Sequence, residues 1–386
     1  MRQDLISKKV KDVPPSGIRK FFDLILTMDD VISLGVGEPD FTTPWHIRER
    51  SIHSLESGHT TYTSNKGLLK LREEVASSLE KSHHLSYDPE EEILITTGVS
   101  EGLDLALRAL INPGDEIIIP EPCYVSYAPC TIFADGRPVG IATRVEDGFK
   151  VRPSEIKDAL TSRTKAILLC YPNNPTGASL GKEELGQIAE VIRENDLIVI
   201  TDEIYRDLTY EGKHTSIASL PGMKERTLIL DGFSKAYAMT GFRIGYAAGP
   251  EEIISAMTKI HQYTMLCAPI LSQKAAIEAL KEGEEEKRKM IATYRKRKNL
   301  IVNGLNSIGL YCLMPEGAFY AFASVKETGL ACEDFSEQLL KQEKVATVPG
   351  TAFGKCGEGF IRCSYATSTK VIEEALKRME RFLRGI

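Results

Sequence analysis

A single lysine stands in an unusual setting near the middle of the chain. Lys235 lies among small residues directly after the apolar run Thr227–Leu230, and Arg243 follows eight positions later in a glycine-flanked turn. A lone lysine is usually a solvated surface residue. An amine that must form an imine needs its neutral form, which desolvation and a nearby cation favour. A planar, permanently charged arginine suits a phosphate group. The pair therefore predicts a reactive amine beside an anion site.

Polar residues also follow two other apolar runs. Asp202 and Tyr205 come after Leu197–Thr201, and Asn174 lies in an Asn-Pro-Thr-Gly turn after Lys165–Cys170. Such residues can simply cap a helix or form a tight turn. A carboxylate beneath a pyridine nitrogen would instead keep that nitrogen protonated, so that the ring can draw in electrons. The hydroxyl of Tyr205 could then donate a hydrogen bond to the ring's phenolic oxygen, and Asn174 would point an amide donor into the crevice.

A further corner joins an apolar run to a helical pattern. Val99, Ser100 and Glu101 follow Gly98 at this corner. Free backbone N–H groups and the helix dipole make such a position a ready phosphate site. The Gly-x-Gly-x-x-Gly spacing of a dinucleotide site is absent both here and at Gly35-Val36-Gly37.

The elements that must position these residues are short buried strands separated by helices. Nearly continuous apolar, β-branched runs are typical of strands covered on both faces. Such runs occur at Ile93–Thr97, Glu116–Ile119, Lys165–Cys170, Leu197–Thr201, Thr227–Leu230 and Ile244–Ala248. Helical patterns at Glu101–Ile111 and Lys182–Asn195 lie between some of them. This alternation predicts an α/β fold with a mostly parallel central sheet, whose ligands bind at the carboxyl ends of the strands.

The pattern changes after Glu251. A helical region extends to Lys281, and a highly charged run at Glu284–Asn306 predicts a long exposed helix. Shorter elements follow, predicted as strands at Gly317–Ala323 and Phe360–Ser364 and as helices at Cys332–Lys341 and Thr369–Leu383. These predict a smaller α+β domain formed by both termini. We expect residues 1–45 to belong to it as an N-terminal segment, 46–283 to form the large cofactor-binding domain, and 284–386 to form the C-terminal small domain.

The composition of the chain limits the kinds of partner that it is expected to bind. The chain has 386 residues and a formal net charge of −6, which argues against nucleic acid or an anionic membrane as partner. No apolar run approaches the ~18 residues of a membrane span, and Met1–Lys11 lacks the apolar core of a signal peptide. A cytoplasmic location is therefore expected. The eight cysteines form no Cys-x-x-Cys pair, and the histidines show no metal-ligand spacing, so no metal site is predicted.

Together these motifs resemble those of a known enzyme family. In their order and spacing, the lysine–arginine, Asp-Glu-x-Tyr and Asn-Pro-Thr-Gly motifs resemble the class I aminotransferases of fold type I, close to the prokaryotic aspartate and aromatic branch. The resemblance covers nearly the whole chain, from Ser33–Phe41 to Phe360–Ala366. It implies a homodimer with shared active sites and pyridoxal 5′-phosphate as cofactor. It also implies ping-pong transfer of an amino group from an amino acid to a 2-oxo acid.

The resemblance implies a role for each matching residue. Lys235 would carry the cofactor as a Schiff base and move the substrate proton. The other expected cofactor contacts are Asp202 at the ring nitrogen, Asn174 and Tyr205 at the phenolic oxygen, Tyr124 stacked on the ring, and Arg243, Ser234 and the backbone of Val99, Ser100 and Glu101 at the phosphate. Tyr62 would reach the phosphate in the neighbouring subunit. Arg362 would bind the substrate α-carboxylate, helped by Asn174 and the backbone at Gly37.

Two positions depart from better-known members. Position 232 is glycine where a phosphate-binding serine is common, so Ser234 is expected to replace it. Ser100 stands where some aspartate-using relatives carry a lysine, and the segment Tyr263–Cys267, which borders the substrate from across the dimer, is largely apolar. An unpaired buried carboxylate is costly, so neutral, often aromatic, donors are expected, with 2-oxoglutarate as acceptor. Arg19 or backbone N–H groups could bind the distal carboxylate of that acceptor.

Other functions stay open on the sequence alone. An aspartate aminotransferase, an N-acetyl-diaminopimelate aminotransferase and a β-lyase would share the same motifs. A ligand-sensing regulator built on this fold would need an attached DNA-binding domain. The aminotransferase-like region begins near residue 14, and the net charge is negative, so the regulator is disfavoured.

Overall fold

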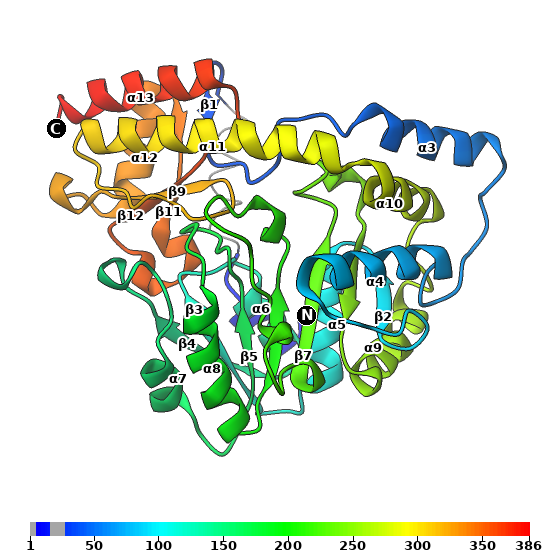
Figure 1. The fold of residues 1–386 in the computed structure, drawn as a ribbon. Helices are drawn as coiled ribbons and strands as arrows, with labels where there is room; N and C mark the ends of the chain where they lie inside the picture. The colour runs from blue at the N-terminus through cyan, green and yellow to red at the C-terminus, as the bar shows by residue number, and fades with distance from the viewer. Residues whose placement is uncertain (1–4, 16–27) are drawn as a thin grey trace.

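A computed structural model describes residues 5–15 and 28–386 of the chain (Figure 1). Its central feature is a seven-stranded sheet with the strand order β2-β8-β7-β6-β5-β3-β4. The strands are β2 (Ile93–Thr96), β3 (Glu116–Glu121), β4 (Arg137–Ala142), β5 (Thr164–Leu169), β6 (Ile198–Asp202), β7 (Thr227–Gly232) and β8 (Gly245–Ala248). Only β8 runs antiparallel to its neighbours. The mostly parallel sheet expected from the sequence is confirmed.

Helices cover both faces of this sheet. One apolar layer joins Ile117, Leu168 and Leu230 to α5 (Val99–Leu110), α6 (Tyr127–Phe133) and α9 (Glu251–Thr264). Alternate strand residues such as Ile118, Ile167 and Ile95 point to the opposite face. That face is covered by α4 (Leu69–His83), α8 (Lys182–Glu194) and α10 (Ile270–Glu282), while α3 (Trp45–Glu56) packs on α10 and α7 (Pro153–Ala159) on α8. Burial on both faces explains the nearly continuous apolar character of these strands.

A second group of elements forms around the C-terminal part of the chain. Strands β9 (Tyr320–Ser324), β11 (Val348–Pro349) and β12 (Phe360–Ser364) make an antiparallel sheet in the order β11-β12-β9. The helices α11 (Glu284–Ser307), α12 (Cys332–Glu343) and α13 (Thr369–Leu383) share one apolar core with it. Figure 1 shows α11 running across the molecule from the side of α10 to that of α13. The domain boundaries at residues 45 and 283 stay predictions.

Two details of the helices differ from the sequence expectation. The helical region after Glu251 is broken between α9 and α10, where Pro269 precedes the second helix. Helix α11 is not exposed throughout, because Tyr294, Ile301 and other residues of one face are buried. The N-terminal segment contributes a short strand, β1 (Ile32–Ser33), which pairs in parallel with β10 (Val345–Ala346). The N-terminal segment is therefore hydrogen-bonded to the C-terminal part of the chain.

The helix nearest the N-terminus is short. Helix α1 (Lys8–Asp12) contacts α6, and Lys9 pairs with Asp135 at 3.1 Å. No helix in the described ranges is long and apolar enough to cross a membrane.

Glycines allow the sheet to approach the start of α5 closely. A Cβ atom on Gly245 would lie 2.8 Å from the backbone nitrogen of Val99 and 2.9 Å from the carbonyl carbon of Gly98. Backbone atoms cannot rotate away as a flexible side chain can. The strand β8 therefore fixes the position of the corner from which α5 begins.

We predict that Gly245→Ala destabilises the protein by about 1–3 kcal/mol, because overpacking at this contact must shift the backbone. Chemical denaturation followed by circular dichroism measures the change. Gly241→Ala is the matched control, since nothing lies within 4 Å of its new Cβ, and its effect should stay within about 0.5 kcal/mol. Equal stability of the two variants would contradict the prediction.

Candidate active site

A cavity of about 420 Å³ opens at the carboxyl ends of the parallel strands. It receives residues from the loops after β3, β5, β6 and β7, from the start of α5, from the segment 35–38 and from β9 and β12. The predicted site residues that line it are Gly37, Val99, Ser100, Tyr124, Asn174, Asp202, Tyr205, Ser234, Lys235, Arg243 and Arg362. Loops that are remote in sequence meet here because the strand ends lie along one edge of the sheet.

Lys235 reaches this cavity from the loop after β7. Its Nζ donates a hydrogen bond to the carbonyl oxygen of Gly37 at 2.6 Å. The pKa of Lys235 is lowered to about 8, chiefly by burial; Glu38 opposes this shift, while Arg362 and Arg243 contribute to it. Roughly a tenth of such amines are neutral at pH 7, against fewer than one in a thousand for an ordinary lysine. The environment therefore favours a nucleophilic amine.

Asp202 ends β6 on the floor of the cavity. The hydroxyl of Tyr127 donates to its Oδ2 at 2.8 Å, and the backbone N–H of Ile204 donates to its Oδ1 at 3.2 Å. Burial raises the pKa of Asp202 to about 6, against these two hydrogen bonds, which lower it. A buried carboxylate of this kind is stabilised by any cation placed against it.

An anion site lies at the start of α5. Gly98 precedes this helix with a φ of 77°, and a Cβ atom there would lie 2.7 Å from Nη2 of Arg243. Glycine therefore lets the guanidinium lie against the helix N-terminus, where both attract negative charge. Arg243 itself has a φ of 50°, an uncommon conformation for a residue with a side chain.

The structure explains the glycine at position 232. A Cβ atom there would lie 3.0 Å from Cα of Gly245 and 3.0 Å from the carbonyl oxygen of Ile244. A serine would therefore have to displace the neighbouring strand β8. Ser234 lines the cavity, and its role at the phosphate stays a prediction.

Arg362 points into the cavity from β12 and is 3% exposed. Its Nη1 donates to Oδ1 of Asn174 at 2.8 Å, and its Nη2 donates to the carbonyl oxygen of Gly35 at 2.6 Å. The Nε atom is buried without a hydrogen-bond partner, and no carboxylate within the described residues forms an ion pair with this guanidinium. Burial lowers the pKa of Arg362. A carboxylate entering the cavity would supply the missing countercharge.

Two predicted residues do not line the cavity. The side chain of Glu101 turns away, accepting from the backbone N–H of Thr97 and lying 2.6 Å from Nδ1 of His261. Tyr62 is 80% exposed on the surface. Neither position conflicts with the expected contacts, since one used the backbone of Glu101 and the other used a second subunit.

Sequence reasoning missed two tyrosines. Tyr127 is fully buried and bonds Asp202, and the hydroxyl of Tyr320 lies 2.7 Å from that of Tyr205. The only sequence signal for Tyr127 is its position three residues after Tyr124 at the start of a helix.

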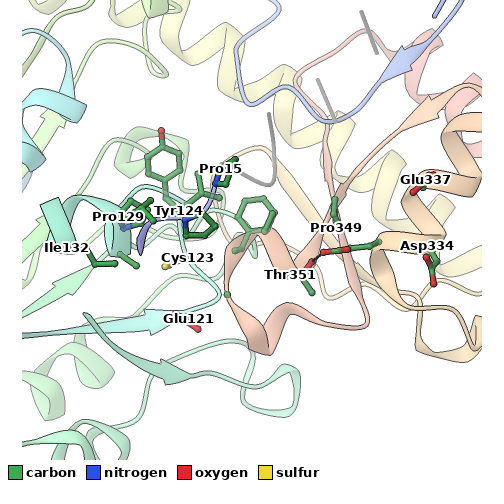
Figure 2. Close-up of a pocket in the computed structure, with 18 residues that line it drawn as sticks. Pro15, Glu121, Cys123, Tyr124, Pro129, Ile132, Asp334, Glu337, Pro349 and Thr351 are labelled. Atoms are coloured by element: carbon green, nitrogen blue, oxygen red, sulfur yellow. Dashed lines mark hydrogen bonds between the residues drawn. The ribbon is translucent and has the colours of Figure 1, made fainter. Parts of the chain in front are cut away.

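A second cavity of about 510 Å³ is also lined by Tyr124 (Figure 2). It is lined by Pro15, Cys123 and Pro129 and by acidic residues that include Asp334 and Glu337. Apart from Tyr124 it contains none of the predicted site residues. The smaller cavity therefore remains the candidate active site.

Comparison with known proteins identifies the family. The family model described as aminotransferase class I and II matches residues 29–379. The chain belongs to this aminotransferase family. It is 56% identical to the putative aminotransferase YugH of Bacillus subtilis and 46% identical to an aspartate aminotransferase of Pyrococcus abyssi, with 98% of each chain covered in both cases. The crystal structure of an aromatic aminotransferase from Pyrococcus horikoshii is 44% identical, with a TM-score of 0.91 over 95% of this chain and 99% of that one.

These findings confirm the class I aminotransferase family and its fold type I architecture. They also establish the enzyme as a transaminase whose cofactor is pyridoxal 5′-phosphate. The cavity fits this cofactor. Arg243 and the start of α5 match a phosphate, the buried carboxylate of Asp202 matches a protonated ring nitrogen, and Lys235 matches an aldehyde.

We predict that Lys235 reacts as an amine with a pKa of about 8 in the cofactor-free protein. Its labelling by acetic anhydride should rise about tenfold per pH unit below pH 8 and level off above it, because only the neutral amine reacts. Peptide mass spectrometry measures the rate at each pH. Lys289 serves as the internal control, because its pairing with Glu285 raises its pKa and its labelling should still rise above pH 10. A midpoint for Lys235 near that of Lys289 would contradict the prediction.

Proposed function

We propose that this aminotransferase prefers L-amino acids with neutral, often aromatic, side chains and transfers their amino group to 2-oxoglutarate. The observation that carries this proposal is the distribution of charge around the cavity. The cations among its described lining residues are Lys235, Arg243 and Arg362. Each has a role in amine chemistry, phosphate binding or α-carboxylate binding, so none remains for the distal carboxylate of aspartate.

The rest of the described cavity wall supports a neutral side chain. Ser100 lines the cavity where a lysine would be needed, and the carboxylate of Glu38 lies on the same wall. The Thr240 hydroxyl donates to Oε1 of Glu38, which holds this carboxylate at the wall. Leaving a second carboxylate unpaired beside it costs on the order of several kcal/mol. Arg19, which could bind the distal carboxylate of 2-oxoglutarate, lies outside the described residues.

The proposed roles of the residues follow from their positions. When bound, the cofactor supplies a ring that draws electrons from the substrate Cα. Arg362 binds the α-carboxylate as a bidentate fork, and its contact with Asn174 fixes the plane of that fork. Lys235 removes the proton from Cα and returns it, because its pKa of about 8 suits a general base near neutral pH. Asp202 holds the ring nitrogen protonated, and Tyr205 and Asn174 donate to the phenolic oxygen.

We also propose a homodimer whose two active sites are shared. Tyr62 and Tyr263 are 80% and 83% exposed, and Met265 and Leu266, which follow Tyr263 in sequence, are exposed as well. The Asn65 side chain donates to the carbonyl oxygen of Leu266 at 2.7 Å, so the two segments lie side by side. Large apolar side chains gathered on a surface mark an interaction site. A second copy of the chain would cover them and bring Tyr62 to its phosphate. The cytoplasmic location stays a prediction.

Substrate preference is the first expected outcome. The kcat/KM for phenylalanine and tyrosine, with 2-oxoglutarate as acceptor, should exceed that for aspartate. The panel includes N-acetyl-diaminopimelate, and a cysteine conjugate assayed for pyruvate and ammonia. Aspartate exceeding both aromatic donors by tenfold, about 1.4 kcal/mol of transition-state stabilisation, would contradict the proposal. Preference for the acylated diamino acid, or release of pyruvate and ammonia, would replace it with the corresponding alternative.

Complementation tests the shared sites. Lys235→Ala should retain the cofactor through its phosphate and ring contacts, yet lose nearly all turnover, because one amine serves both imine exchange and proton transfer. Mixing it with an inactive Tyr62 variant should restore activity, since a hybrid dimer contains one intact site. The control is a mixture of Lys235→Ala and wild-type chains for which the rate of subunit exchange is known. No recovery after verified exchange would exclude shared sites.

A further inference from the structure

Tyr320 occupies a central place in the active site without a role in the reaction described so far. It begins β9 and is 1% exposed, yet it lines the active-site cavity. Its hydroxyl lies 2.7 Å from the hydroxyl of Tyr205. The guanidinium carbon of Arg362 lies 4.4 Å from the centre of its ring. One side chain therefore contacts both the residue proposed to bond the phenolic oxygen and the residue proposed to bind the substrate.

Gly37 shows that the position of Tyr320 is built into the site. A Cβ atom on Gly37 would lie 2.5 Å from the hydroxyl oxygen of Tyr320, so this approach requires glycine. The carbonyl oxygen of the same glycine accepts the hydrogen bond from Lys235. The register of β9 against β12 pairs Tyr320 with Ser364, two residues after Arg362. The backbone thus holds Tyr320 against Tyr205, Arg362 and Gly37 together.

Counting protons assigns a direction to the hydrogen bond between the two tyrosines. Each phenol carries one proton and can donate once. Burial raises the pKa of both Tyr205 and Tyr320, so both stay protonated at neutral pH. If the Tyr205 hydroxyl donates its hydrogen bond to the cofactor's phenolic oxygen, Tyr320 must be the donor in the bond between the two tyrosines. A hydroxyl that accepts a hydrogen bond is polarised and becomes a stronger donor.

We propose that Tyr320 is a positioning residue that strengthens the hydrogen bond from Tyr205 to the cofactor and supports the guanidinium of Arg362 with its ring. The two contributions come from different parts of the side chain. The hydroxyl acts on Tyr205, and the aromatic face acts on Arg362 through a cation–π contact. This inference rests on the roles proposed above for Tyr205 and Arg362.

The first test uses the visible absorbance of the resting holoenzyme, which changes when the Lys235 nitrogen bound to the cofactor loses its proton. While that nitrogen is protonated, its charge stabilises the negative phenolic oxygen. After the proton leaves, the oxygen depends more on Tyr205. Weaker donation from Tyr205 in Tyr320→Phe should therefore raise the pH midpoint of the band by at least about 0.3 units. A rise below 0.2 units, or a fall, overturns the role of the hydroxyl.

A double-mutant cycle separates this role from a general effect on packing. In a Tyr205→Phe background, Tyr320→Phe should add less than 0.1 units to the midpoint, because the bond that it removes is already gone. An equal addition in both backgrounds overturns the proposal. Tyr365→Phe is the matched control, since Tyr365 is fully buried in the same core and its hydroxyl donates to Ala318 at 3.2 Å. The same upward shift in this control also overturns the proposal.

Steady-state kinetics test the role of the ring. Tyr320→Phe keeps the aromatic face, so its KM for the best amino donor should stay within twofold of wild type. Tyr320→Leu loses that face and should raise KM at least fivefold. A KM that is the same in both variants overturns this part. If wild-type protein shows no lysine-linked visible band, the proposed roles of the site fail. If wild type shows the band but Tyr320→Phe does not shift it, only the role of Tyr320 fails.

Discussion

The rest of the active site depends on the buried guanidinium of Arg362 and on the contacts that this group makes. Removing this cation from water is costly, and no carboxylate within the described residues compensates it. Asn174, the carbonyl of Gly35 and the ring of Tyr320 stabilise it only in part. These partners come from the loop after β5, the N-terminal segment and β9. Arg362 therefore brings three parts of the chain together, and the proposed substrate carboxylate would supply the missing partner.

Burial also disfavours the charge of other groups in the cavity. Burial lowers the pKa of Lys235 to about 8 and raises that of Asp202 to about 6, so both side chains shift toward their neutral forms. Groups whose pKa values are shifted by their environment in this way mark functional sites. The phosphate and ring nitrogen of the cofactor would supply charged partners for groups that burial has removed from water.

Close backbone contacts connect the fold to this chemistry. Gly98 admits Arg243 to the start of α5, Gly245 lets β8 lie against that corner, and Gly37 admits the hydroxyl of Tyr320. Any larger residue would displace backbone or a functional side chain by several tenths of an ångström. These glycines set distances in the site, whereas the apolar strands set its place at one edge of the sheet.

The sequence by itself determined the motifs, most strands and the edge where ligands bind, because buried strands and the polar residues after them leave local patterns. The strand Phe360–Ser364 and the helix Thr369–Leu383 were predicted with the bounds that the structure shows. The strand β4 was not predicted from the sequence, because it lies at the edge of the sheet and is only partly buried. Only the tertiary structure decided that Tyr127 bonds Asp202 and that Tyr320 contacts Tyr205 and Arg362. Those contacts join residues 75, 115 and 42 positions apart. They depend on strand order and register, which are set by packing across the whole chain and leave no local pattern.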